Sequence, residues 1–185
     1  MRKLVALIVL TVCLFPLVSQ QQSVSVTCDM VALKGIFEET LCIRTECSFG
    51  LSDEFGFSIP VSCIIEKEIG STLFLQSGLF LKYRPFCNPL FLSVSLLQVG
   101  MFVIDVYQKE DSKLHFLNEL TFGWTYKHKS GLVIEPQLIL SDPNGISADA
   151  YEELGDRFSH FPMTRVSVLL GWSFSIQGLE KKGGL

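Results

Sequence analysis

The sequence lacks most of the patterns on which catalysis and metal binding depend. It contains no Gly-rich phosphate loop, no Ser in a GxSxG turn and no close CxxC pair. Cys42 and Cys47 have an odd spacing, which points their thiols to opposite faces of a strand, and no second ligand pair accompanies them. An odd number of cysteines follows the apolar N-terminal segment, which argues against a tight disulfide framework. We therefore expect no catalytic site, no cofactor and no metal site.

Long apolar runs and positive charge are also scarce. The run 4–18 is shorter than the roughly 20 residues of a membrane-spanning helix, and Pro16 interrupts it. Arg2 and Lys3 precede this run, as in a secretory signal peptide, so we predict a cleaved signal over 1–20. Without Arg2 and Lys3 the 15 basic side chains fall to 13 against 19 acidic ones, and the resulting charge of −6 excludes nucleic acid as a partner.

Helical periodicity is nearly absent, whereas a period of two residues recurs throughout the mature chain. Turn residues separate the alternating segments. This pattern predicts eight strands, over 23–34, 36–50, 54–67, 71–83, 89–107, 113–128, 131–141 and 163–174.

Two segments could form helices instead. In the long connection 142–162, Asp149 and Glu152 have capping-box spacing and Gly155 would stop the helix, which predicts a surface decoration of at most two turns. The apolar segment 89–104 could be a membrane helix, but it is short and contains several polar residues. We favour a strand there, although both of its faces are apolar.

The two faces of most strands differ strongly in polarity. In segment 36–50 one face is apolar (Leu41, Ile43, Cys47, Phe49) and the other polar (Thr40, Arg44, Glu46, Ser48). A small membrane barrel requires apolar residues outside and polar residues inside. The predicted fold is therefore all-β, an antiparallel up-and-down eight-stranded transmembrane β-barrel over 21–174, with a C-terminal tail over 175–185.

Aromatic residues of outward parity lie at the ends of the even-numbered strands. Eight antiparallel strands bring these ends to one side, where aromatics would meet the bilayer surface. The predicted belt consists of Phe49, Tyr83, Trp124, Tyr126, Trp172 and Phe174, and Phe37 and Phe116 would start an opposite belt.

Charged residues have inward parity in most strands. Eight strands leave a lumen wide enough only for side chains, so these residues would form a salt-bridged plug; a narrow polar or proton pathway is the alternative. The predicted lumen network consists of Asp29, Arg44, Glu46, Glu66, Lys82, Glu119, Glu135 and Arg165.

Three residues conflict with a regular barrel. Pro60 and Pro136 fall inside strands, where each removes a ladder hydrogen bond, so we expect bulges or shortened pairing. Asn118 has the parity of the lipid-facing side.

Three stretches, "FLQSGLFLKYRPF", "HFLNELTFGWTYKHKSGLVIEPQLILSDPNG" and "RVSVLLGWSF", resemble the small paralogous eight-stranded outer-membrane proteins of spirochaetes, particularly treponemes. The resemblance implies an outer-membrane barrel with surface loops and no established enzyme activity. Outer-membrane chains commonly end on the aromatic residue that the barrel-assembly machinery reads, whereas eleven residues follow Phe174 here.

The sequence thus predicts a non-enzymatic, porin-like outer-membrane protein. Its partners would be membrane lipids, the barrel-assembly machinery and host surface molecules, with passage of small apolar solutes as a further role. Two alternatives are a soluble exported lipocalin-like barrel that binds a hydrophobic ligand, and a lipid-modifying barrel enzyme that uses His115 or His160 beside a carboxylate.

Overall fold

The computed structural model describes residues 23–32, 40–66, 72–85, 89–104, 114–158 and 163–175. The signal peptide and tail predicted above lie outside these residues, apart from Ser175. The strands are β1 (Ser23–Asp29), β2 (Thr40–Gly50), β3 (Phe55–Glu66), β4 (Leu73–Tyr83), β5 (Leu90–Ile104), β6 (Leu114–Leu117), β7 (Glu119–Trp124), β8 (Tyr126–Lys127), β9 (Leu132–Ser141) and β10 (Thr164–Ser175), and one helix, α2 (Ala148–Arg157), precedes β10.

The strands form one closed antiparallel barrel. Neighbours along the chain pair from β1 to β5, and β10 pairs with both β9 and β1, which closes the sheet. Since β6, β7 and β8 are consecutive pieces between β5 and β9, they occupy one position, and the barrel has eight strand positions. The predicted eight-stranded antiparallel fold is confirmed.

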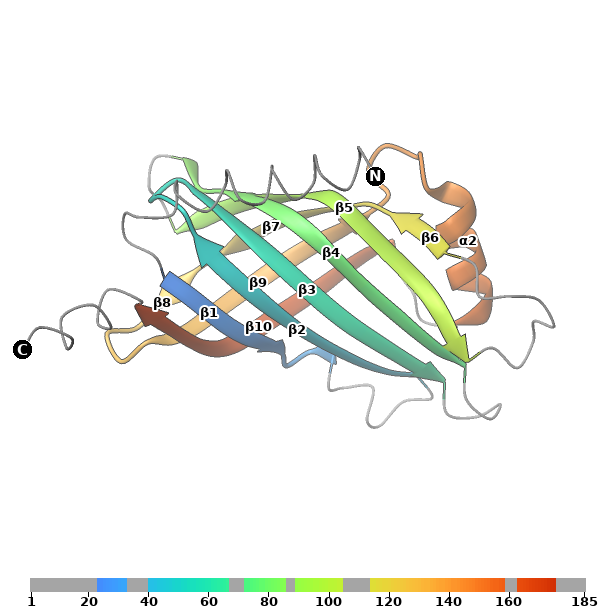
Figure 1. Cartoon of the computed structure of the whole chain (residues 1–185), viewed down its shortest axis with the longest axis horizontal. Coiled ribbons are helices and arrows are strands. Elements are labelled where there is room, and N and C mark those ends of the chain that lie inside the picture. Colours follow the sequence, from blue (N-terminus) through green and yellow to red (C-terminus); the bar gives the residue numbers. More distant parts are fainter. Residues whose placement is uncertain are drawn as a thin grey trace, which may run out of the picture.

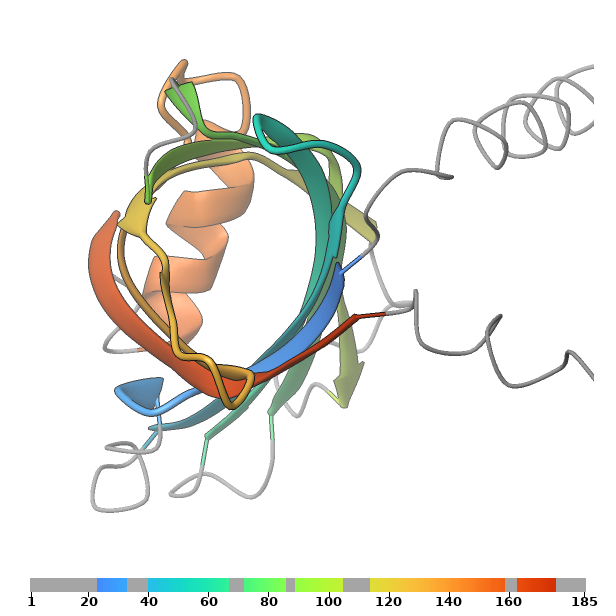
Figure 2. The same ribbon diagram turned by 90° about the vertical axis from the view of Figure 1, so that its left-hand side faces the viewer.

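The two ends of the barrel differ (Figure 1). At one end, here called the terminal end, β1 begins and β10 finishes, and only short turns join the strands. The opposite end, here called the mouth, carries the longer connections and α2 (Figure 1). Viewed along the barrel, α2 lies across the opening at the mouth (Figure 2).

Strand β5 contains a bulge that explains its doubly apolar sequence. Leu79 pairs with Leu97 and Phe80 with Ser95, so Leu96 is extra on the β5 side. The bulge reverses the inward parity, from Phe91 and Ser93 before it to Gln98 and Phe102 after it. The alternative of a membrane helix over 89–104 is therefore wrong, and no helix among the described residues is long and apolar enough to cross a membrane.

The two prolines interrupt pairing as expected. Pairing of β3 with β4 skips Ile59 and Pro60 without a change of register. Pro136 keeps its place opposite Val168 of β10, but on the β7–β8 side the described pairing is interrupted between Gly123 and Tyr126. Proline lacks the N–H that the ladder needs, so each residue breaks the pairing only locally.

One strand boundary at the mouth differs from the prediction. β1 ends at Asp29, although we predicted a strand to 34; the predicted start of the next strand at 36 lies outside the described residues, which resume with β2 at Thr40. The cause at Asp29 is local, because its carboxylate accepts hydrogen bonds from the backbone N–H groups of Val31 and Ala32 and turns the chain. Residues 33–39, including Phe37, lie outside the described residues.

The barrel wall is taller on one side of the mouth than on the other. β9 ends at Ser141, which pairs with Glu119, and β10 begins at Thr164 opposite Leu140. Strand β6 precedes Glu119 in the sequence and lies farther toward the mouth than the end of β9. Within the described chain, β6 pairs only with β5. α2 contacts β6 and occupies this low side of the rim (Figure 1).

α2 differs from the helix that the sequence predicted. It starts after Ser147, without a side-chain cap, and continues through Gly155 to Arg157. Gly155 does not stop it, because apolar residues on both sides of Gly155 are buried against the barrel, and packing outweighs the low helix propensity of glycine. The helix is therefore a packed part of the barrel and not a decoration.

Candidate functional site in the barrel interior and mouth

The barrel is polar inside and apolar outside. Arg44, Glu46, Lys82, Glu119 and Glu135 are all buried, and Lys82 and Glu119 are each only 1% exposed. The outward positions, in contrast, expose large apolar side chains from every strand position, among them Val26, Ile43, Val61, Leu79, Leu97, Phe116, Phe122, Leu138 and Val166. This polarity is the inverse of that of a water-soluble domain.

One group of charges, here called the Lys82 cluster, lies near the terminal end. The Lys82 ammonium donates a hydrogen bond to Glu135 at 2.7 Å and lies 3.9 Å from a Glu46 carboxylate oxygen. Thr125 donates to the other oxygen of Glu135 at 2.7 Å, and Arg44 forms an ion pair with Glu46 at 3.6 Å. Two cations thus face two carboxylates, so the cluster is neutral as a unit.

An aromatic ring completes the environment of Lys82. The Lys82 Nζ lies 3.9 Å from the ring centroid of Phe91, a cation–π contact. The Phe91 ring occupies the space beside Gly123, where an added Cβ would lie 2.4 Å from the ring. Glycine at 123 is therefore required for Phe91 to lie flat against the inner wall.

A second group, here called the Arg165 cluster, lies nearer the mouth. Arg165 of β10 forms a charge-assisted hydrogen bond with Glu119 of β7. Gln76 donates to Glu119 at 3.3 Å and accepts from Ser62 at 3.4 Å. The cluster therefore connects four strand positions across the lumen.

The predicted lumen charges thus fall into two separate groups. Of the remaining two predicted residues, Asp29 accepts backbone hydrogen bonds on its carboxylate from Val31 and Val168, and Glu66, the last residue of β3, is half-buried. Parity alone identifies the face of each strand, and it cannot tell at which height along the barrel a side chain lies.

Several buried polar atoms in the lumen have no hydrogen-bond partner within the described part of the chain. They belong to Arg44, Ser93, Gln98, Gln137 and Ser167. Gln137 and Ser167 are direct cross-strand partners, so two of these side chains are neighbours. Buried polar groups are normally paired with protein or ordered water, so these positions require water. Sequence parity indicates their inward orientation and gives no sign of their missing partners.

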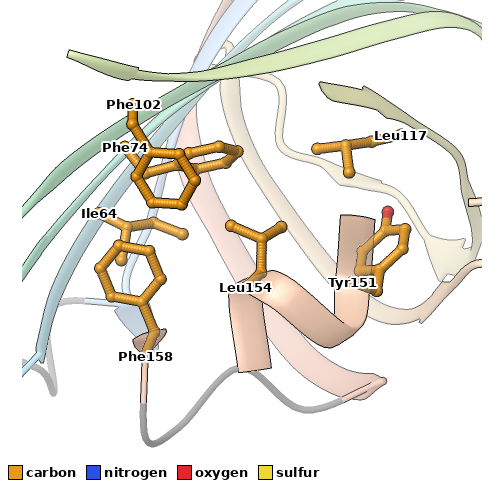
Figure 3. Packing of buried hydrophobic residues seen from close by; sticks show 7 residues of the cluster. All are labelled: Ile64, Phe74, Phe102, Leu117, Tyr151, Leu154 and Phe158. Carbon is orange, nitrogen blue, oxygen red and sulfur yellow. The ribbon is translucent and has the colours of Figure 1, made fainter. Parts of the chain in front are cut away.

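The interior changes character at the mouth (Figure 3). Apolar side chains from four strands meet three from α2 and the residue after it, and Phe102 and Phe158 stack with centroids 6.2 Å apart. Cys42 packs against this group from β2. This mouth cluster consists of Ile64, Phe74, Phe102, Leu117, Tyr151, Leu154 and Phe158.

A glycine and a histidine border the mouth cluster. An added Cβ at Gly100 would lie 2.2 Å from the ring of Phe74, so the absence of a side chain at 100 lets this ring fill the lumen. His115 is buried beside the rings of Phe74 and Phe102, edge-on to both, and its Nδ1 lies 3.8 Å from a carboxylate oxygen of Glu153. Of the two histidines considered for catalysis, His115 is thus covered by α2, and His160 lies outside the described residues.

The contacts of Asn118 explain why this polar residue has the parity of the lipid-facing side. Its side chain donates to Asn144 at 2.7 Å, and its backbone carbonyl accepts from Asp142 N–H and the Tyr151 hydroxyl. It therefore belongs to the rim, where it holds the connection before α2.

All six residues of the predicted aromatic belt are exposed on the outer surface. Val24 of β1 pairs with both Phe49 and Phe174, Phe55 pairs with Tyr83, and Leu132 pairs with Trp172. Trp124 and Tyr126 lie on β7 and β8, whose pairing partners Leu90 and Ile134 are also near the terminal end. The six side chains thus gather around that end.

No protein-family model and no curated protein matches this chain. Among solved structures, the backbone structure of the Yersinia pestis outer membrane protein Ail in a phospholipid bilayer nanodisc matches with 10% sequence identity and a TM-score of 0.46. The match covers 84% of this chain and 99% of that chain. A likeness at this level carries no information about ligands or partners, so the fold assignment rests on the strand pairing itself.

Proposed function

We propose that the chain is a non-enzymatic integral outer-membrane β-barrel. The inverted polarity supports this most strongly, because a closed barrel with ionised side chains inside and exposed apolar side chains around its whole outer surface is suited to lipid and not to water. A soluble barrel that binds a hydrophobic ligand would need the opposite arrangement.

The dimensions of the barrel agree with this proposal. β4 has 11 residues, and a strand of that length extends for about 36 Å, or about 28 Å along the axis when it is tilted by about 40°. The apolar band of an outer-membrane barrel is about 25 Å tall. The terminal-end aromatics then form a belt at one membrane surface, and Phe116, 62% exposed, contributes to the other.

The filled lumen argues against an open pore. The Lys82 and Arg165 clusters and the mouth cluster occupy successive heights of the interior. In our proposal the protein is exported by a cleaved signal, inserted by the barrel-assembly machinery, and oriented with its mouth outward. Its exposed connections would then meet the environment, host surface molecules or small apolar solutes.

The proposal can be tested on the full-length chain expressed in a bacterium with two membranes. We expect the protein in the outer-membrane fraction after carbonate washing, and faster gel migration unheated than boiled, because a folded barrel resists detergent. N-terminal sequencing of that fraction should locate the cleavage near residue 20. A carbonate-soluble protein that remains a compact monomer without detergent would contradict the proposal.

A further inference from the structure

The attachment of α2 to the barrel differs from that of every strand. α2 belongs to no hydrogen-bonded ladder, and its buried contacts come from Tyr151, Leu154 and the following Phe158. On the barrel side, the carbonyl of Asn118 accepts both the Tyr151 hydroxyl at 2.7 Å and the Asp142 N–H at 3.0 Å. These contacts could be lost without opening the barrel wall.

The outer face of α2 is solvated and acidic. Asp149, Glu152 and Asp156 are all exposed on this face. The connection before the helix contains Gly145 at φ 70°, with no atom within 4 Å of an added Cβ, and Asp142 at φ 47°. The space beside Gly145 is thus open, whereas the hydrogen bonds of Asn118 with Asn144 and of the Ser147 N–H with Asp142 hold the rest of the connection.

Beneath the mouth cluster lie the buried polar groups that require water. Gln98 has both side-chain polar atoms without a partner in the described chain, and Gln137 and Ser167 each have one such atom. At the terminal end, the contacts of Lys82 with Glu135 and Glu46 cross the lumen. These polar groups therefore lie between the mouth cluster and the Lys82 cluster.

We propose that α2 is a reversible plug. In the docked state Leu154 and Phe158 close the mouth against Phe74 and Phe102, and in the undocked state water and small polar solutes enter the lumen as far as the Arg165 cluster, while the barrel stays intact. This inference rests on the barrel fold and holds whatever the protein meets at the cell surface.

A native thiol inside the lumen reports on the plug. Cys42 points inward against the mouth cluster, whereas Cys28, Cys47 and Cys63 have outward parity. A chain that retains Cys42 as its single mature cysteine, with the others and Cys87 replaced by alanine, can be folded in detergent micelles and treated with a charged maleimide. Because Cys42 is partly exposed in the docked state, the change in its labelling rate relative to the parent measures opening of the mouth.

The parent should be labelled slowly, and Leu154→Ala should accelerate labelling by at least about tenfold, because this substitution removes fully buried methyl groups from the docked state only. Glu152→Ala, on the exposed face of α2, is the matched control and should leave the rate unchanged. Tyr151→Phe removes the hydrogen bond to the Asn118 carbonyl without a cavity and should accelerate labelling by roughly two- to tenfold. It also serves if Leu154→Ala fails to fold.

Heat-modifiable migration must first show that each variant is a folded barrel. Equal labelling rates in the parent and in a folded plug variant, Leu154→Ala or Tyr151→Phe, would overturn the proposal, since entry would then bypass α2. A parent that remains unlabelled while Leu154→Ala is labelled would also overturn it, because the native plug would then be permanent.

Discussion

The Lys82 cluster predicts a large and specific loss of stability on removal of one charge. Lys82→Met keeps the length of the side chain but leaves Glu135 without its hydrogen-bonded cation and Glu46 with its ion pair to Arg44 alone. Breaking a buried ion pair by removing one partner costs about 3–5 kcal/mol. The lost cation–π contact with Phe91 is worth roughly 0.5–2 kcal/mol, so the unpaired carboxylate dominates.

Urea unfolding in phospholipid vesicles measures this effect, because Trp124 and Trp172 are exposed on the outer surface and report on the change from lipid to water. Lys127→Met, which removes an exposed lysine, is the control and should leave stability unchanged. The double variant Lys82→Met/Glu135→Gln should recover most of the loss, since it removes the uncompensated charge as well. A loss below about 1 kcal/mol for Lys82→Met, with no recovery in the double variant, would refute the assignment of a buried ion pair.

Three further predictions test other parts of the structure. Val61→Arg, halfway along β3 on the outer surface, should destabilise the vesicle-embedded barrel by about 2–4 kcal/mol in the same urea assay. Tyr126→Arg, at the terminal end, should destabilise it by only about 0–1 kcal/mol. Equal losses of stability for the two variants would contradict contact of the outer surface with lipid. Gly100→Ala should cost roughly 1–3 kcal/mol in that assay, because the new methyl group displaces the ring of Phe74, and Gly100→Ala/Phe74→Leu should recover part of it. Burial raises the pKa of Tyr151 above its usual value of about 10. The contribution of Tyr151 to α2 docking should therefore be complete below pH 10 and lost as the pH rises further. In a spectrophotometric titration of the parent and Tyr151→Phe, the difference gives the ionisation of Tyr151, and ionisation at or below pH 10 would contradict this prediction.

The strand arrangement could be predicted from the sequence because it depends on local alternation. Arg44 and Glu46 reveal the inner face of β2 without knowledge of any other strand, since side chains two residues apart share a face. Leu169 is an apolar residue at an inward position of β10, but it is fully buried, and an apolar residue in the lumen costs nothing in a barrel filled by side chains.

Features that depend on distant partners could not be predicted in this way. Lys82 and Glu135 are 53 residues apart, and their contact follows from the register of strands that the sequence pattern leaves free. The bulge at Leu96 is invisible among apolar neighbours, because either parity gives an acceptable pattern there. The length of α2 is set by the rings of Phe74 and Phe102, so capping residues within the helix are a poor guide to its end.

The two ends of the lumen are closed by different physical means, and this difference predicts a separation of effects. At the terminal end, directional ion pairs join strands that have ladder partners on both sides, so this closure opens only when the barrel unfolds. At the low side of the mouth the wall is incomplete, and non-directional apolar packing by a helix closes it. Lys82→Met should therefore lower the unfolding free energy while leaving the Cys42 labelling rate of the folded barrel unchanged. Leu154→Ala should raise the labelling rate far more than it lowers the midpoint of global unfolding. If both variants changed both quantities in proportion, opening of the mouth and unfolding of the barrel would be one event, and α2 would be part of the cooperative fold and not a plug.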